Sequence, residues 1–291
     1  MRKIALLILA ALFAVSCTSG VNTENLTDTI TDDYGRQVVV PTAPQHIVST
    51  SPAVTEIIFA LGGGPLLCGR TDFCAYPPQV EQIPSIGGIS NLNVEHVLSL
   101  SPDLVVSGSM VPEKCVAQLQ AMNVPVVCVP EKTTFQGLYQ NIATIGALIG
   151  RAEAADSLNQ QIRQQLQHIA QRTDTAHRPT LYYVVGFGAG GNYTAGGGTF
   201  INDIITLAGA SNIAQDVEGW NYSLEALMQH DPDYILIRSA DSAAFCSMAP
   251  YTKLSAVRQG RVIAIESGMI DLQVPRNLDA IKLISARISG K

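Results

Sequence analysis

Short hydrophobic runs alternate along most of the chain with longer stretches in which hydrophobic residues recur every three or four positions. The short runs are IVST at 47–50, IPSIGG at 83–88, DLVVSG at 103–108 and PVVCVP at 125–130. Such runs, bounded by Gly, Pro or Asp, are typical of strands buried on both faces of a parallel sheet. The stretch 52–61 is predicted to be a helix, because Ser precedes it as a cap and Pro occupies its first position. Strands that alternate with helices predict an α/β fold with mainly parallel sheets.

The segment before this alternating region predicts a hairpin. It reads TITDDYGRQVVVP at 29–41, with the turn at Asp33-Tyr34-Gly35. The adjacent pair Asp32-Asp33 is interpreted as a turn signal, since Asp forms local hydrogen bonds with turn backbone.

A long helix is predicted at residues 151–173, in the middle of the chain. Its hydrophobic positions form one stripe: Ala154, Leu158, Ile162, Leu166 and Ile169. At ~1.5 Å per residue the helix would span roughly 34 Å, about the width of a small domain. It is either a packing helix inside one domain or a rigid connector between an N-terminal α/β lobe, 28–150, and a C-terminal α/β lobe, 174–291.

A repeated pattern favours the connector. Residues 93–106 read NVEHVLSLSPDLVV, and residues 223–236 read SLEALMQHDPDYIL. Each copy has a capping residue, a Glu two positions later (Glu95 and Glu225), Pro-Asp and a hydrophobic strand, and all matches lie 130 residues apart. A unit that recurs once at the spacing of a domain indicates two similarly built lobes, although two capped units can also resemble each other by chance.

The first residues have the pattern of an export signal. A basic start and a hydrophobic run at 2–15, too short to span a membrane, end in Ala-Val-Ser-Cys at 14–17. This ending resembles a bacterial lipobox, so 1–16 is predicted to be a lipoprotein signal peptide, Cys17 the lipidated residue and 17–27 a tether. The alternative is an ordinary signal peptide with an incidental Cys. The lipoprotein would be anchored in the periplasm or at the outer face of the cytoplasmic membrane.

Composition narrows the classes of function. Hydrophobic residues make up 47% and charged residues 14%, which excludes intrinsic disorder. The net charge is −6 and no run is rich in Lys or Arg, which argues against a nucleic-acid-binding protein. Neither CxxC pairs nor clustered histidines occur, so no metal site is predicted. Disulfide connectivity stays open among five cysteines: Cys68, Cys74, Cys115, Cys128 and Cys246.

A glycine motif at 186–191, GFGAGG, fits the dinucleotide-binding pattern but lacks its context. It follows a hydrophobic strand, yet the next residues are polar and glycine-rich, and no second strand ends in an acidic residue ~20 positions later. An exported NAD-dependent enzyme is therefore a distant alternative. Glycines here equally suit a loop whose backbone approaches a bulky ligand.

Four segments resemble the periplasmic binding proteins of ABC importers for cobalamin, haem and iron-siderophores. They are the hairpin at 29–41, IVSTSPAVTEIIFALG at 47–62, TDFCAYPPQVEQIPSIGG at 71–88 and NLNVEHVLSLSPDLVV at 91–106. The hairpin segment is similar to the iron-siderophore members, whereas the YPPQ segment and the Glu-bearing helices are most similar to the cobalamin-binding members. The resemblance covers about residues 28–289 and is more specific for the family than for the ligand.

The resemblance implies two Rossmann-like lobes joined by a single long backbone helix, with the ligand in a largely pre-formed cleft between them. It implies a monomeric binding protein, not an enzyme, which has no cofactor and acts with a dimeric permease and its ATPase. The ligand would be a corrinoid such as cobalamin, or alternatively haem or an iron-siderophore. Glu95 and Glu225 match the residues that dock such proteins on the permease, although acidic residues at these positions also stabilise a helix N-terminus.

Three aromatic residues are the first candidates for ligand contact. Phe73, Tyr193 and Trp220 match positions at which the cobalamin-binding members carry aromatic residues. Aromatic rings suit the flat, weakly polar face of a corrin or porphyrin. The alternative for each of them is packing in the protein interior.

Two methionines and two arginines complete the candidates. Met110 and Met269 lie at predicted strand ends, where they would be packing residues, ligand contacts or, with haem as the ligand, an axial ligand to iron. Arg70 and Arg276 are the cations that an anionic siderophore would require.

Overall fold

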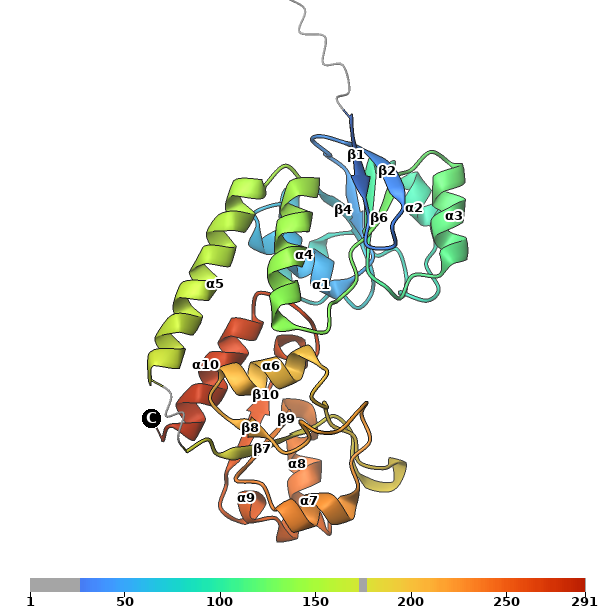
Figure 1. The fold of residues 1–291 in the computed structure, drawn as a ribbon. Helices are drawn as coiled ribbons and strands as arrows, with labels where there is room; N and C mark the ends of the chain where they lie inside the picture. Colours follow the sequence, from blue (N-terminus) through green and yellow to red (C-terminus); the bar gives the residue numbers. More distant parts are fainter. Residues whose placement is uncertain (1–26, 173–176, 291) are drawn as a thin grey trace, which may run out of the picture.

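The structure, a computed structural model, describes residues 27–172 and 177–290 and has two lobes. The N-terminal lobe lies above the C-terminal lobe in Figure 1, and the long helix α5 (Ala152–Arg172) runs along one side of both. Each lobe contains a four-stranded parallel sheet. The predicted α/β class, with two lobes and one long helix between them, is confirmed.

The N-terminal lobe has the strand order β4-β3-β5-β6. These strands are β3 (Ile47–Ser49), β4 (Leu67–Arg70), β5 (Leu104–Ser107) and β6 (Val126–Cys128). The helices are α1 (Pro52–Ala60), α2 (Val94–Ser99), α3 (Glu113–Ala121) and α4 (Phe135–Leu148), with 3-10 turns η1 (Gly64–Leu66) and η2 (Pro78–Gln82). An antiparallel hairpin of β1 (Thr27–Thr31) and β2 (Gln37–Pro41) precedes them, as predicted.

The C-terminal lobe has the order β8-β7-β9-β10. Its strands are β7 (Thr180–Val184), β8 (Ser211–Asn212), β9 (Tyr234–Arg238) and β10 (Val262–Ile265). Its helices are α6 (Phe200–Leu207), α7 (Leu224–His230), α8 (Ser239–Ser247), α9 (Ser255–Arg258) and α10 (Asn277–Ile288), with 3-10 turns η3 (Gly188–Gly190), η4 (Tyr251–Lys253) and η5 (Ser267–Met269). If the strands of each lobe are counted along the chain, both sheets have the order second, first, third, fourth.

One hydrophobic core is shared by the two lobes. Along β5, Leu104 and Val106 pack into this shared core, whereas Val105 faces a separate cluster with α2 and α3. Along β9, Leu236 faces the shared core, and Ile237 faces a second separate cluster under α7 to α9. Strand side chains alternate between faces, so each sheet needs hydrophobic residues on both, which explains its continuous hydrophobic runs.

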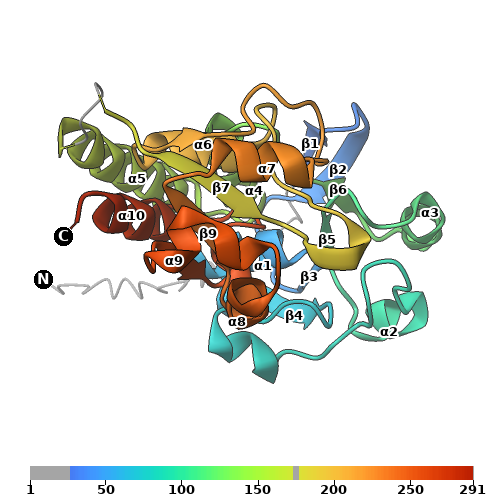
Figure 2. The same ribbon diagram turned by 90° about the horizontal axis from the view of Figure 1, so that it is seen from below.

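Helices at the junction close this shared core. In Figures 1 and 2, α5 and α10 lie side by side at one edge of the molecule, and they are in contact. Ile162 of α5 and Ile284 of α10 are buried in the shared core. Figure 2 also shows α7, α8 and α9 on the outer side of the C-terminal lobe.

Two polar side chains of the C-terminal lobe complete backbone hydrogen bonding in the N-terminal lobe. The carboxylate of Asp203 accepts a hydrogen bond of 2.7 Å from the backbone N–H of Phe135, the first residue of α4. Gln273, 1% exposed, accepts from the N–H of Lys132 at 2.9 Å and donates to the carbonyl of Thr134 at 2.8 Å. Buried polar groups require such partners, so these contacts hold the lobes in one relative position.

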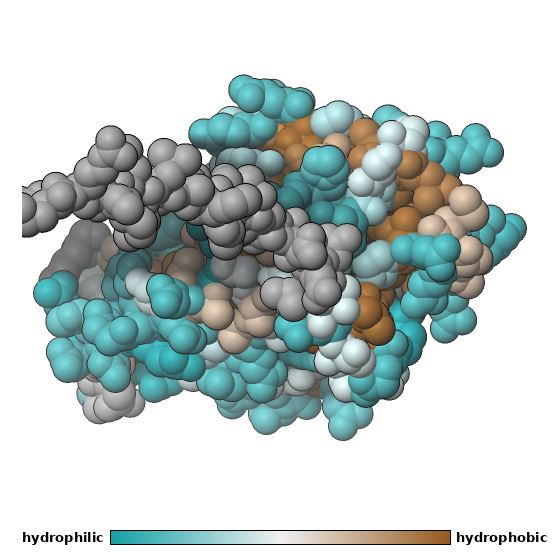
Figure 3. All heavy atoms as spheres, turned by 90° about the horizontal axis from the view of Figure 1, so that it is seen from above, coloured by the Kyte–Doolittle hydropathy of each residue, from teal (hydrophilic) through white to brown (hydrophobic). Residues whose placement is uncertain are grey.

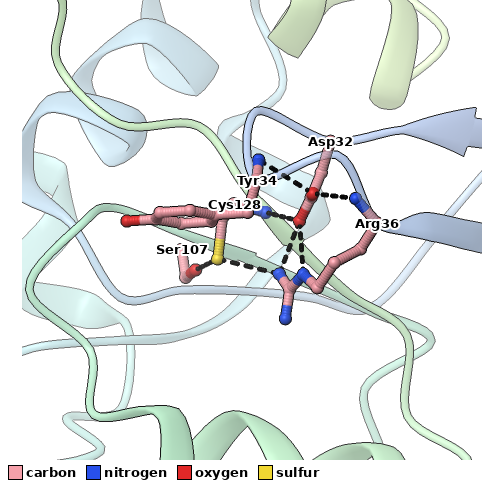
Figure 4. Close-up of polar contacts among 5 residues, drawn as sticks. All are labelled: Asp32, Tyr34, Arg36, Ser107 and Cys128. Atoms are coloured by element: carbon pink, nitrogen blue, oxygen red, sulfur yellow. Dashed lines mark hydrogen bonds and ion pairs between the residues drawn. The ribbon is translucent and has the colours of Figure 1, made fainter.

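The hairpin is attached to the N-terminal lobe through Asp32 (Figure 4). Its buried carboxylate accepts hydrogen bonds from the backbone of Tyr34 and Arg36, from the Arg36 guanidinium and from the N–H of Cys128 at 3.3 Å. Burial alone would raise the pKa of Asp32, but these hydrogen bonds outweigh burial and lower the pKa. Asp32 therefore secures both the turn and its contact with β6.

Seen from above, hydrophobic residues gather in the right half of the view, the side on which Figure 1 shows the hairpin and α3 (Figure 3). Exposed hydrophobic residues on these elements are Tyr34, Val39 and, directly after α3, Met122.

Several expectations need correction or lie outside the described residues. The segment 83–88 was expected to be a strand but makes only single bridges, at Ser85 and Gly87, because Pro84 has no N–H and Gly87 has a positive φ of 92°. The five cysteines between Cys68 and Cys246 are all free thiols. No helix among residues 27–172 and 177–290 is long and hydrophobic enough to cross a membrane. The predicted signal peptide 1–16 and Cys17 lie outside the described residues.

Candidate ligand-binding cleft

A cavity of about 300 Å³ lies at the carboxyl ends of β3 and β5. The chain leaves β3 towards α1 on one face of the sheet and leaves β5 towards α3 on the other, so the two connections diverge. A crevice at such a point is where open α/β sheets bind ligands. The N-terminal lobe lines the cavity mainly with Thr50, Ser51, Pro52, Gly108, Ser109 and Met110.

The opposite side of this cavity comes from the C-terminal lobe. The segment after β10 supplies Ser267, Gly268, Asp271 and Leu272. A second cavity of about 420 Å³ shares Phe73, Gly268 and Leu272 with the first and adds Glu56, Tyr76, Glu266 and Arg276. We refer to these two adjoining cavities together as the cleft.

Two of the predicted contacts line the cleft. Phe73 is 64% exposed and borders both cavities, and Met110 is 66% exposed and borders the first. Gly88 lies beside the Phe73 ring, where an added Cβ would be 3.6 Å from it. By contrast, Met269 packs against the shared core and does not line the cleft.

Tyr193 and Trp220 lie together in the C-terminal lobe but do not line either cavity. Tyr193 bridges Asn221, and the carbonyl of Trp220 accepts a hydrogen bond of 2.8 Å from Thr194. Their side chains are 38% and 46% exposed, so neither is a core residue. An extended ligand would have to reach beyond the two cavities to touch them.

The glycine motif belongs to the same loop. After β7 it forms the turn η3 and no helix begins before Phe200, so it lacks the helix that a dinucleotide fingerprint requires. The ring of Tyr193 packs over Gly186 and Gly191, where an added Cβ would lie 3.0 and 3.4 Å from its atoms. The glycines therefore make room for Tyr193.

The lobes meet in the cleft through an ion pair between a buried Glu and a partly exposed Arg. Arg276, at the start of α10, donates from Nε to Glu56 Oε1 at 2.8 Å and from Nη2 to Oε2 at 2.7 Å. The guanidinium also lies over the ring of Tyr76, 3.7 Å from its centroid. Burial raises the pKa of Glu56, against the effect of Arg276. Burial would lower the pKa of Arg276, but its hydrogen bonds with Glu56 outweigh burial and raise it.

A second ion pair lies behind the first cavity. Arg238, the last residue of β9, donates from Nε to Asp271 at 2.7 Å and from Nη1 to the carbonyl of Val185 at 3.3 Å. Tyr183 donates to the other oxygen of Asp271. The hydrogen bonds with Asp271 raise the pKa of Arg238, and burial raises the pKa of Tyr183.

Charges in the cleft are therefore mostly neutralised or negative. Glu131 in the first cavity and Glu266 in the second have no ion-pair partner among the described residues. Arg70, the other candidate for an anionic ligand, donates to the backbone carbonyls of Ile83 and Thr71 instead. Within the described ranges, no group of three or more His, Cys, Asp or Glu residues is arranged to hold a metal ion.

Glu95 and Glu225 lie outside the cleft in matching environments. Both are exposed in the first turns of α2 and α7. The side chains of Asn93 and Ser223 cap these helices by accepting hydrogen bonds of 3.0 Å from the backbone N–H groups of His96 and Ala226, respectively. The repeated pattern therefore produces the same local structure in each lobe.

Sequence inspection missed Glu56, Tyr76 and the 266–272 segment as cleft residues. The available signal was topological: in a parallel sheet the residues after the first and third strands of a lobe converge. That signal identifies Thr50 and Gly108, but it does not show which part of the other lobe faces them.

Comparisons with known proteins agree with this architecture. The sequence pattern of the periplasmic binding proteins matches residues 47–268. An uncharacterized ABC transporter substrate-binding lipoprotein of Bacillus subtilis, YvrC, is 28% identical over 98% of this chain and 95% of its own length. A cobalamin-binding protein of Halobacterium salinarum is 31% identical over 84% of this chain and 69% of its own. A periplasmic heme binding protein from Pseudomonas aeruginosa, of known structure, has 28% identity and a TM-score of 0.74 over 84% of this chain and 92% of that chain.

The fold, the cleft between two lobes and the match over most of the chain define a ligand-binding receptor. The chain belongs to the periplasmic binding protein family. This membership confirms the resemblance found in the sequence and the prediction of a binding protein rather than an enzyme.

Proposed function

We propose that this protein is an extracytoplasmic lipoprotein that binds a corrinoid in its cleft and delivers it to an ABC importer. The observation that carries the choice of ligand is the charge of the cleft. Among the described residues, Arg276 is the one cation that lines it, and Arg276 is paired with Glu56, whereas Glu131 and Glu266 are unpaired. The cleft is therefore acidic.

An acidic cleft favours a neutral or cationic ligand. Haem carries two propionates, and catecholate or carboxylate siderophores form anionic ferric complexes, so each requires a cation that is free to bind it. The peripheral amides of a corrinoid are neutral, and its cobalt centre carries positive charge. Like charges 4 Å apart near a protein surface repel by about 4 kcal/mol, enough to decide between these ligands.

The hydrophobic part of the cleft supports a large flat ligand. Phe73, Ile89, Met110 and Leu272 all border the first cavity. An exposed aromatic ring beside aliphatic side chains can cover the face of a macrocycle, and such contacts are worth about 1 kcal/mol beyond the area buried. Tyr193 and Trp220 would extend this surface for a ligand that protrudes from the cleft.

The names of similar proteins support the proposal without deciding the ligand. One relative is a cobalamin-binding protein, and vitamin B12-binding proteins are also similar, whereas the structure from Pseudomonas aeruginosa binds heme. Haem is the second candidate, and Met110 favours it, because its exposed thioether borders the first cavity and is a group that can serve as an axial ligand to iron.

Delivery requires a surface that both lobes share. We assign Glu95 and Glu225 to docking on a permease dimer that acts with its ATPase, while the binding protein itself is a monomer. One exposed carboxylate on each lobe, in the same local structure, suits a partner with two-fold symmetry.

Titration of the purified protein tests the ligand. Trp220 is the single tryptophan, so its fluorescence reports binding of any ligand that absorbs light. We expect cyanocobalamin and cobinamide to bind at least 100-fold more tightly than haem or a ferric tricatecholate. Tighter binding of either anionic ligand would overturn the corrinoid proposal, and an absorption spectrum with haem would show whether Met110 coordinates the iron.

Fractionation of producing cells tests the anchor. Cys17→Ser should move the protein from the membrane fraction to the soluble fraction. A wild-type protein that is already soluble, with an unmodified N-terminus, would contradict the lipoprotein assignment.

A further inference from the structure

The second cavity combines polar groups from both lobes in one place. Glu56 and Tyr76 come from the N-terminal lobe, and Glu266 and Arg276 come from the C-terminal lobe. The first cavity, in contrast, is bordered mainly by small and hydrophobic residues on its N-terminal side. The two cavities therefore offer different chemistry to two parts of one ligand.

Arg276 is held in place as a hydrogen-bond donor. Two of its nitrogens bind Glu56, and Tyr76 supports one face of its guanidinium. Gly268 leaves room for it, since an added Cβ there would lie 2.8 Å from Nη2. Nη1 has no hydrogen-bond partner among the described residues, and the side chain borders the second cavity and is 18% exposed, so this nitrogen remains available as a donor to a ligand.

Two acceptors border the same cavity as this donor. Glu266 is exposed at the cavity, and its carboxylate has no hydrogen-bond or ion-pair partner within the described part of the chain. Tyr76, 43% exposed, presents a hydroxyl that both donates and accepts. The charges of Glu56 and Arg276 offset each other, so Glu266 gives the second cavity a net negative charge. A carboxylate on the ligand would meet this charge, although Arg276 could donate to it.

A primary amide matches the same groups better than a carboxylate does. Its oxygen accepts from a guanidinium or a phenol, and its NH₂ group donates to a carboxylate, so it uses both kinds of group at no cost in charge repulsion. A carboxylate has no proton to donate and leaves Glu266 unpaired beside a like charge.

We propose that the second cavity recognises primary carboxamide groups at the edge of the ligand, with Arg276 as the donor and Glu266 as the acceptor. This inference rests on the proposed corrinoid function and refines it, because the acetamide and propionamide arms of a corrinoid are such groups. The ion pair with Glu56 then serves to position Arg276. The cavity selects corrinoids whose arms are amidated over those whose arms are free acids.

Paired ligands test the inference directly. Dicyanocobinamide, with amide arms, and dicyanocobyrinic acid, with carboxylate arms, share the corrin ring and differ in the groups that the second cavity would bind. We expect the wild-type protein to bind the amide at least 30-fold more tightly at pH 7.5, measured by quenching of Trp220. Equal affinities would overturn the inference and leave the corrinoid function in place. If neither corrinoid binds, the proposed function fails, and this inference fails with it.

One isosteric substitution separates recognition from a structural role. Glu266 is exposed, so Glu266→Gln should leave the melting temperature unchanged but reduce the preference for the amide at least fivefold, mainly by improving binding of the acid. Arg276→Lys should weaken binding of the amide about tenfold. A guanidinium makes two parallel hydrogen bonds to Glu56 and keeps a third nitrogen for the ligand, and an ammonium cannot reproduce this geometry. The matched control Glu153→Gln changes an exposed Glu on α5 and should alter neither the affinity for the amide nor that for the acid.

If the Glu266→Gln protein keeps the full preference for the amide, Glu266 is not the acceptor and the inference is overturned.

Discussion

The two lobes have the same strand order but use the carboxyl ends of their sheets in opposite ways. In the N-terminal lobe the ends of β3 and β5 border an open cavity. In the C-terminal lobe the equivalent ends, those of β7 and β9, are filled by Arg238 with Asp271 and Tyr183. The repeat of 130 residues aligns Arg238 with Gly108. At this one position, glycine leaves a cavity open in the N-terminal lobe, and arginine fills the equivalent place in the C-terminal lobe with an ion pair.

The remainder of the repeat is conserved in its physical role within this chain. Asp103 accepts hydrogen bonds from the N–H groups of Gln45 and His46, directly before β3. Asp233 accepts from the N–H and hydroxyl of Thr180, at the start of β7. Each Asp therefore connects the third strand of its lobe with the first at the end of the sheet opposite to the cleft. The two lobes therefore share these strand connections, and they differ at the carboxyl ends of their sheets.

The largest effect should follow from making the N-terminal lobe like the C-terminal lobe. Gly108→Arg places a long side chain in the first cavity, where even its Cβ would lie 3.0 Å from Ser51. We expect corrinoid binding to weaken at least 100-fold, about 2.8 kcal/mol. The matched control is Gly198→Arg, since an added Cβ at Gly198 meets no atom within 4 Å. Equal binding by both variants would show that the first cavity is not the site.

The converse change should reduce the stability of the fold. Arg238→Gly leaves Asp271 and Tyr183 without their cation, and we expect a loss of about 2 kcal/mol in the free energy of unfolding, less than for a fully buried pair because both partners are partly exposed. Denaturant unfolding of Arg238→Gly, Asp271→Asn and the double variant forms a thermodynamic cycle. Additive losses would mean that the two side chains do not stabilise each other.

The hairpin, which only the N-terminal lobe carries among the described residues, should respond to acid. The pKa of Asp32 is lowered in the folded protein, so its ionised form stabilises the fold above its unfolded pKa of about 3.9, and this contribution is lost as the pH falls through the lower folded pKa. Asp32→Asn should cost about 1.5 kcal/mol at pH 7 and progressively less below pH 4. Urea unfolding at several pH values measures this, and a difference that does not shrink as the pH falls below 4 would refute the assignment.

Aromatic residues of the two lobes should contribute similar, smaller amounts to binding. We expect Phe73→Ala and Trp220→Ala each to weaken corrinoid binding by about 1 kcal/mol. Calorimetric titration compares them without the fluorescence of Trp220. If Phe73→Ala alone weakens binding, the ligand is held by the N-terminal lobe and the 266–272 segment, and Trp220 has no part in it.

The smallest change in stability and ligand affinity should come from substitution of Glu95 and Glu225. Glu95→Gln/Glu225→Gln removes two exposed charges from helix N-termini, which should reduce stability by no more than about 1 kcal/mol per site and leave ligand affinity unchanged. Stimulation of the ATPase of a reconstituted importer should nevertheless be lost. Full stimulation with reduced stability would leave these residues as helix-stabilising charges alone.

Much of the fold was predictable because it is encoded locally. The caps Asn93 and Ser223, the Pro at the start of α1 and the stripe along α5 each specify an element from a few neighbouring residues. The repeat also showed that the lobes are similar. In these cases the periodicity and the capping preferences relate residues that are near neighbours along one helix.

The cleft was less predictable because its residues are brought together from distant segments. Phe73 and Met110 were identified in advance, but the pairing of Glu56 with Arg276 joins positions 220 residues apart and has no local pattern. Met269 follows a strand, as a cleft residue would, yet it packs into the shared core. Nothing in the spacing of residues distinguishes these outcomes, because they depend on how two lobes pack.

The contact of Gln273 with the N-terminal lobe has a consequence for the order of assembly. Its buried amide bonds to Lys132, Thr134 and Asn141. During synthesis the N-terminal half is finished long before this residue leaves the ribosome, so the groups that it satisfies must wait for the last stretch of the chain. The contacts between the lobes can therefore form only after this C-terminal segment has been synthesised. A chain truncated before residue 273 would lack both this connection and the Arg276 side of the cleft.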